Sequence, residues 1–157
     1  MKESVMDVDQ INAGLTTCAF EPAWMVRVEL AERDDARVRE AVSAAVGLRY
    51  GDYQGVAFES GGGMQFFQPL EGSVMGDKPH YDGEMWDFTR TVEMPVRVLS
   101  FHLPRDPDVL ARAVEAVRHS HSYEEPVISV LEVLSCRADD KDQRDNLNRW
   151  WNRGFAV

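Results

Sequence analysis

The sequence predicts an α+β fold with the element order β-α-β-β-α-β, in one domain of a 157-residue chain. Alternating apolar residues at Val26, Val28 and Leu30 are typical of a half-buried strand. Val38 and Val42 belong to an apolar series at the spacing of one helix face. Patterns of these two kinds continue along the chain, and a hydrophobic content of 44% is enough for a core.

The first half of the domain is predicted to form a strand, a helix and a second strand. Residues 25–30 alternate and form the first strand. The acids at 34–35 suit the start of a helix, and Gly47 can end it. Residues 53–60 are typical of a second strand, and the glycines at 61–63 indicate a turn or bulge rather than a phosphate loop.

The second half repeats this order after a loop. Residues 72–86 have the composition of a loop, and residues 89–103 are strongly β, with Pro95 marking an edge or a break. The acids at 106–108 introduce a second amphipathic helix. Residues 127–134 form the last core strand.

This order is the split βαβ, or ferredoxin-like, arrangement, in which two helices cover one face of an antiparallel sheet. We expect the domain to span residues 23–137, with an N-terminal arm over 1–22 and an added C-terminal helix over 138–157. Trp150 and Trp151 form an apolar stripe on that polar helix, which therefore needs a surface to pack on. The last two strands are apolar on both sides in places, so self-association is the simplest cover for the open face.

Charge and composition exclude several classes of partner. The formal net charge of −10 and the pI of about 4.8 oppose nucleic-acid binding and anionic membrane surfaces. The N-terminus lacks the pattern of a signal peptide, and no apolar run is long enough for a membrane span. Cys18 and Cys136 are far apart in the sequence and suit a reducing compartment. We expect a cytoplasmic protein.

Two motifs resemble those of a known family. Residues 121–126, HSYEEP, look like the His-Pro-Tyr-Glu-Glu-Pro signature of the domain inserted in Nif-three-like proteins, and resemble a similar corner in the CutA divalent-cation-tolerance, or PII-like, family. The companion signature of the inserted domain is similar to Gly-x-Tyr at 51–53, Phe58 and FQPLEG at 67–72. Ser122 replaces the usual proline, and the loop over residues 77–84 belongs to this chain alone.

The resemblance implies a stand-alone, oligomeric binding or regulatory module, typically a trimer, with clefts between subunits. It does not carry over hydrolase-like chemistry, because the flanking halves that hold the dinuclear metal ligands in Nif-three-like proteins are absent here. We expect segments 53–72 and 119–126 to line a cleft for a small ligand. The candidate residues are Tyr53, Phe58, Phe67, Pro69, Gly72, His121, Tyr123, Glu124 and Glu125.

A divalent metal ion is a second candidate ligand. His119 and His121 form an H-x-H pair, and His121 with Glu124 is the best-placed set for a metal. Residues i and i+2 point apart at a helix end, however, so the alternative is that both histidines only cap the helix. No catalytic residue is assigned. An enzyme with His121 as base and Glu124 as acid, and a partner protein docked through the C-terminal helix, stay open as alternatives.

Overall fold

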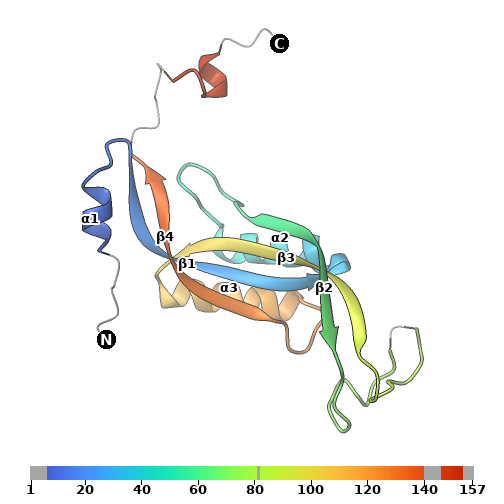
Figure 1. The fold of residues 1–157 in the computed structure, drawn as a ribbon. Helices are drawn as coiled ribbons and strands as arrows, with labels where there is room; N and C mark the ends of the chain where they lie inside the picture. Colours follow the sequence, from blue (N-terminus) through green and yellow to red (C-terminus); the bar gives the residue numbers. More distant parts are fainter. Residues whose placement is uncertain (1–6, 81, 140–145, 154–157) are drawn as a thin grey trace.

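The computed structural model describes residues 7–80, 82–139 and 146–153 (Figure 1). The helices and strands follow one another as α1 (Val8–Asn12), β1 (Cys18–Ala31), η1 (Glu32–Asp34), α2 (Asp35–Val46), β2 (Phe58–Phe67), β3 (Val92–Pro104), α3 (Pro107–Ser120), β4 (Ile128–Ala138) and η2 (Trp150–Asn152). The central elements, from β1 to β4, have the predicted order β-α-β-β-α-β.

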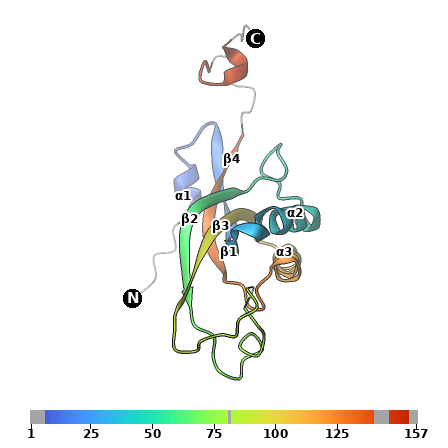
Figure 2. The same ribbon diagram turned by 90° about the vertical axis from the view of Figure 1, so that its right-hand side faces the viewer.

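The four strands form one antiparallel sheet in the order β2-β3-β1-β4. Figure 2 shows α2 and α3 together on one face of this sheet. Each helix joins two strands that lie parallel with a third strand between them, which is the split βαβ connection. The ferredoxin-like α+β class predicted from the sequence is therefore confirmed.

The core lies between the sheet and the two helices. Alternate residues of β1 and β3 point toward the helices, and these helices return every third or fourth residue to the sheet. The buried cluster consists of Val26, Val28, Leu30, Val38, Val42, Leu48, Leu99, Phe101, Leu103, Ala113 and Val117. Burial of each such valine or leucine contributes roughly 1.5–3 kcal/mol, so this layer dominates the stability of the fold.

Two helix ends carry the signals expected from the sequence, whereas the Asp34 side chain at the start of α2 caps no backbone N–H of that helix. Gly47 ends α2 in the left-handed conformation, with φ of 74°, and its N–H donates to the Ser43 carbonyl. At the start of α3, the Asp106 side chain accepts a hydrogen bond from the N–H of Asp108, and Pro107 occupies the first turn.

The first strand is longer than predicted. It begins at Cys18 rather than Met25, so it runs across the boundary expected at residue 23. The start of β1 pairs with β4 alone, because β3 pairs with β1 only from Ala23 onward, and α1 lies beside this segment (Figure 1). There the Asn12 side chain exchanges two hydrogen bonds, of 2.7 and 2.9 Å, with the backbone of Phe20. The amide of Asn12 thus replaces a missing strand partner.

The second strand starts later than predicted, at Phe58 rather than Tyr53. Before it, Tyr50 and Tyr53 form an isolated two-residue bridge. The bulge predicted at the glycines is present, because the pairing of β2 with β3 shifts between Ser60 and Gly63. Pro95 of β3 lies beyond the last residue paired with β1, so the strand has a free edge there, as its proline indicates.

The C-terminal segment differs from the prediction of a helix over 138–157. β4 continues to Ala138, and within residues 146–153 the helical part is the single 3-10 turn Trp150–Asn152. Asn148 donates its N–H to the side chain of Asn146, a local bond that competes with helix formation. The remainder of the predicted helix, 140–145 and 154–157, lies outside the described residues.

The sheet face opposite α2 and α3 keeps apolar side chains in contact with solvent. Leu131 of β4 is 42% exposed on this face, where its register partner is Met25. Phe58, opposite Ser100 on β3, is 67% exposed. Among the described helices, none has both the length and the apolar character that a membrane crossing needs.

Candidate functional site

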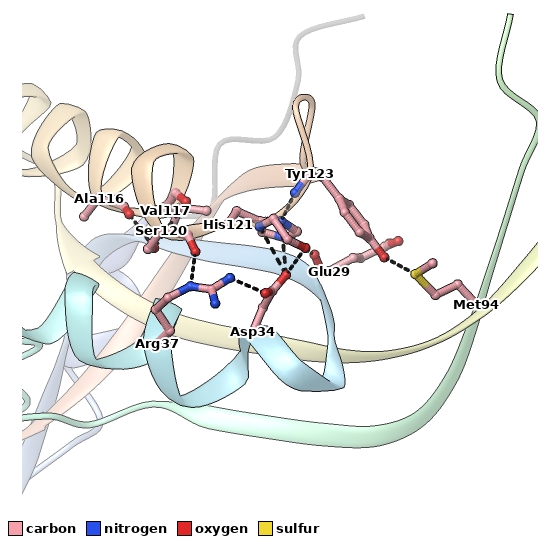
Figure 3. Close-up of polar contacts among 10 residues, drawn as sticks. Glu29, Asp34, Arg37, Met94, Ala116, Val117, Ser120, His121 and Tyr123 are labelled. Carbon is pink, nitrogen blue, oxygen red and sulfur yellow. Dashed lines mark hydrogen bonds and ion pairs between the residues drawn. The ribbon is translucent and has the colours of Figure 1, made fainter. Parts of the chain in front are cut away.

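The connection between α3 and β4, residues 121–127, is called the corner. His121 follows the last helical residue, and its side chain is buried. Its Nδ1 accepts a hydrogen bond of 3.0 Å from the Tyr123 N–H, so Nε2 carries the proton and donates it to the Glu29 carbonyl at 2.8 Å (Figure 3). Nε2 therefore attaches the corner to β1, and Nδ1 holds the backbone of the corner itself.

Asp34 is the second buried group at the corner. Its carboxylate accepts hydrogen bonds from the backbone N–H and the hydroxyl of Ser122 and pairs with the guanidinium of Arg37 (Figure 3). Burial by itself raises the pKa of Asp34, but the hydrogen bonds from Ser122 and the charge of Arg37 outweigh it and hold the pKa below its usual value. The carboxylate is therefore ionised at neutral pH.

Arg37 connects this carboxylate to the end of α3. Its Nε donates a 2.6 Å hydrogen bond to the carbonyl of Ser120, one of the carbonyls that a helix end leaves without an internal partner. The Ser120 hydroxyl donates to the Ala116 carbonyl at 2.6 Å. Because α2, α3 and the corner share this network, the corner is a rigid part of the fold.

Tyr123 extends the corner toward the sheet. Its ring lies 4.7 Å from that of His121, centroid to centroid, and its hydroxyl donates to the Met94 sulfur at 2.8 Å. Burial, together with the negative charge of Asp34, raises the pKa of the Tyr123 hydroxyl. The phenol is therefore neutral and forms a fixed wall between the corner and β3.

A cavity of about 530 Å³ lies beside the corner, and it is called the corner cavity. Figures 1 and 2 both place the loop between β2 and β3 at the same end of the molecule as the corner. The walls come from the corner, the ends of β2 and β3, that loop and η1. The lining residues are Arg33, Gln65, Phe66, Phe67, Val74, Met75, Lys78, Pro79, His80, Trp86, Met94, Ser122, Tyr123, Glu124, Glu125 and Val127. This size and mostly apolar lining are typical of small-molecule sites.

The β2–β3 loop is held in shape by its own contacts. The Gly76 N–H donates to the Ser73 hydroxyl at 2.9 Å. A Cβ on Gly76 would lie 2.7 Å from the Leu70 carbonyl oxygen, so only glycine fits there. The His80 N–H donates to the Glu84 carbonyl at 2.7 Å, which closes a tight turn. The loop is thus an ordered wall of the cavity.

Trp86 packs against aromatic rings of the β2–β3 loop and of β2. The centroid of its ring lies 4.6 Å from that of His80 and 6.0 Å from that of Phe67, both in edge-to-face contact. Within the described residues, its indole Nε1 is buried and has no hydrogen-bond partner. Trp86 was not among the residues predicted for the site; a tryptophan in a segment with the composition of a loop was the available signal.

The structure brings together some of the predicted ligand residues. Phe67, Tyr123, Glu124 and Glu125 line the corner cavity, and His121 lies behind Tyr123. The remaining predicted residues are placed elsewhere: Tyr53 lines a cavity near η2, Phe58 lies at the start of β2, and Pro69 and Gly72 do not line the corner cavity.

The two histidines predicted as metal ligands do not converge, because each makes contacts of its own. His119 is exposed and lies 3.4 Å from Glu115 one helical turn earlier. His121 has no nitrogen free for a metal ion while the corner is intact. Across residues 7–80, 82–139 and 146–153, no group of three or more His, Cys, Asp or Glu side chains could hold a metal ion.

A polar contact between β3 and β4 lies on the open face, and no sequence pattern predicted it. The Nδ1 atom of His102 lies 2.5 Å from the hydroxyl of Ser135 on β4. Burial, with the charge of Arg137, lowers the pKa of His102, so the ring is neutral. Ser135 is buried, so this pair fixes β3 relative to β4 and does not present a nucleophile.

The fold of this chain is similar to those of several solved structures. No family model matches the sequence, and no curated protein matches it. A Bacillus cereus protein related to NIF3 superposes with a TM-score of 0.56 at 19% identity, over 82% of this chain and 34% of that one. This chain thus spans about a third of the length of that protein. The likeness confirms, for the fold, the resemblance seen in the two motifs.

Two further structures are less similar. CutA1 from Oryza sativa has a TM-score of 0.47 at 13% identity, over 73% of this chain and 82% of that one. The divalent ion tolerance protein CutA1 from Ehrlichia chaffeensis has a TM-score of 0.47 at 8% identity, over 78% and 87%.

Proposed function

We propose that this protein is a small binding module whose ligand site is the corner cavity. The observation that carries the proposal is the cavity itself, about 530 Å³ with aromatic walls from β2, the β2–β3 loop and the corner. Its inner wall is made rigid by the hydrogen bonds of His121 and Asp34. A preformed site of this kind binds its ligand without the entropy loss of ordering its walls.

Binding is favoured over catalysis because His121, the base predicted for the corner, is not free. A general base needs an available lone pair within reach of a substrate proton. Both nitrogens of His121 are occupied, and the ring is separated from solvent. Glu124 and Glu125 line the cavity, but the acid–base pair predicted from the sequence, Glu124 with His121, requires a free nitrogen on His121.

The neutral dye N-phenyl-1-naphthylamine tests whether the cavity binds ligands, since its fluorescence rises in apolar sites. We expect saturable binding to the wild type and at least tenfold weaker binding to Phe67→Ser, which removes one wall. Phe58→Ser is the matched control, because it makes the same change on the same strand outside the cavity. Equal dye binding by the two variants would place the site elsewhere.

The module is proposed to act as an oligomer, as a trimer in the arrangement predicted from the sequence. Support comes from the exposed apolar residues on the open sheet face, including Leu131 and Phe58. A cytoplasmic location and a divalent metal as ligand also stay predictions. For the metal, Zn²⁺ titration calorimetry that gives equal heats for the wild type and His119→Ala would argue against any role of His119.

A further inference from the structure

The indole N–H of Trp86 is the feature of the corner cavity that its own residues leave unexplained. The Nε1 atom is buried, and within the described residues it has no hydrogen-bond partner. Buried polar groups in native proteins nearly always have a partner, so an orphan donor on a residue that lines a cavity indicates a missing acceptor. The binding of a ligand that carries such an acceptor would satisfy it.

The walls around Trp86 indicate the shape of that ligand. Phe67 and His80 meet the Trp86 ring edge to face, and Tyr123 closes the corner side. Aromatic walls of this kind favour flat rings, which pack against them by offset or edge-to-face contact. A volume of about 530 Å³ has room for a ring system of one or two fused rings with a short substituent.

The charges around the cavity indicate where the acceptor would lie. Lys78, on the same loop as Trp86, lines the cavity, and no ion pair holds it within the described part of the chain. Arg33 of η1 also lines the cavity, and it too has no ion pair within the described residues. Glu124 and Glu125 lie on the corner side and would repel an anion there. The loop side, with one indole donor and one ammonium, is therefore the side for a negatively charged acceptor.

We propose that the corner cavity selects small aromatic carboxylates, whose ring packs among Phe67, Trp86 and Tyr123. The carboxylate accepts the Trp86 Nε1–H and faces the ammonium of Lys78. This inference rests on the proposed binding function and names the chemical class of its ligand. The selecting groups lie on the β2–β3 loop, which includes the segment 77–84 that has no counterpart in the family resemblance.

The experiment compares two probes with the same ring, 2-naphthoate and 2-naphthylmethylammonium, by titration calorimetry. The wild type is expected to bind naphthoate about tenfold or more tightly than the ammonium probe, the difference expected from one hydrogen bond to a charged group. Trp86→Phe keeps an aromatic ring but removes the N–H, so it should lose most of this preference while still binding N-phenyl-1-naphthylamine. Lys78→Gln should weaken naphthoate alone.

Trp150→Phe is the matched control, because it makes the same substitution at a tryptophan that does not line this cavity. It should bind both probes as the wild type does. Equal affinities of the wild type for the two probes, or an unchanged preference in Trp86→Phe, would overturn the proposed ligand class while leaving the binding function standing. If neither the probes nor the neutral dye binds, the binding function fails as well.

Discussion

At the scale of single residues, Asp34 is the group on which the corner most depends. It receives hydrogen bonds from Ser122 and pairs with Arg37, so three parts of the chain meet at one carboxylate. His121 lies nearby, its Nδ1 3.7 Å from the carboxylate and thus beyond hydrogen-bond reach. An ionised, fully buried carboxylate is stabilising only while these partners remain in place.

Replacement of Asp34 tests this dependence through pH. Because the folded-state pKa lies below the unfolded value of 3.8, the ionised carboxylate stabilises the fold fully above that pH and progressively less as pH falls through the folded pKa. Asp34→Asn should lower the free energy of unfolding by about 1–3 kcal/mol at pH 7. The difference in the free energy of unfolding between the wild type and Asp34→Asn should narrow below about pH 3.8.

Urea denaturation between pH 2.5 and 7 provides the measurement. Asp9→Asn, at an exposed position of α1, serves as a control for the loss of one acidic charge away from the corner. A difference between wild type and Asp34→Asn that stays constant over the whole range would show that the charge of Asp34 does not stabilise the fold.

The two cysteines show how much a residue's role depends on folding. They are 118 positions apart and give no sequence signal of pairing. In the sheet, β1 and β4 bring them together, and the hydrogen bond with the Cys18 thiol, with burial, raises the pKa of Cys136. The Cys136 thiol is therefore less reactive than a free cysteine at neutral pH.

At the scale of elements, the β2–β3 loop is the segment that makes the cavity. Its composition alone predicted only a loop, because glycine, proline and acids do not define which residues will meet. The contacts of Gly76 and the tight turn closed by His80 and Glu84 give it a fixed shape. Trp86 is placed against β2 only as a result of that shape.

Gly76→Ala is expected to disturb this loop. The added methyl group would overlap the Leu70 carbonyl and the Phe88 ring, so the backbone must move, at a cost of about 1–3 kcal/mol. N-phenyl-1-naphthylamine should bind the variant more weakly than the wild type. Gly14→Ala is the control, since a Cβ there meets nothing within 4 Å. Unchanged dye affinity in Gly76→Ala would mean that the loop does not shape the site.

At the scale of the whole molecule, the open sheet face is the surface through which copies of the chain are proposed to associate. Leu131 and Val130 are neighbours on β4 with almost the same exposure, 42% and 44%. They point to opposite faces, because Val130 pairs with the core residue Val26 and Leu131 with Met25. If the open face is the subunit interface, only Leu131 is buried on assembly.

Leu131→Glu should therefore dissociate the oligomer, because a carboxylate would be buried without a partner, at a cost of about 2 kcal/mol or more per subunit. Val130→Glu should leave the oligomer intact. Sedimentation velocity of both variants and the wild type over a range of concentrations measures the effect. A wild type that remains monomeric, or equal dissociation of the two variants, would contradict this role of the open face.

The sequence by itself determined the order of strands and helices, the helix caps at Gly47 and Asp106, and the bulge in β2. These features follow from local rules, namely side-chain period, backbone conformation and capping. Of the residues that line the corner cavity, the sequence indicated Phe67, Tyr123, Glu124 and Glu125, because they belong to recognisable motifs. Tertiary structure decided the rest. No local pattern encodes contacts between distant segments. Such contacts occupy the nitrogens of His121, bury the indole N–H of Trp86 without a partner among the described residues, and bring the free thiols of Cys18 and Cys136 together.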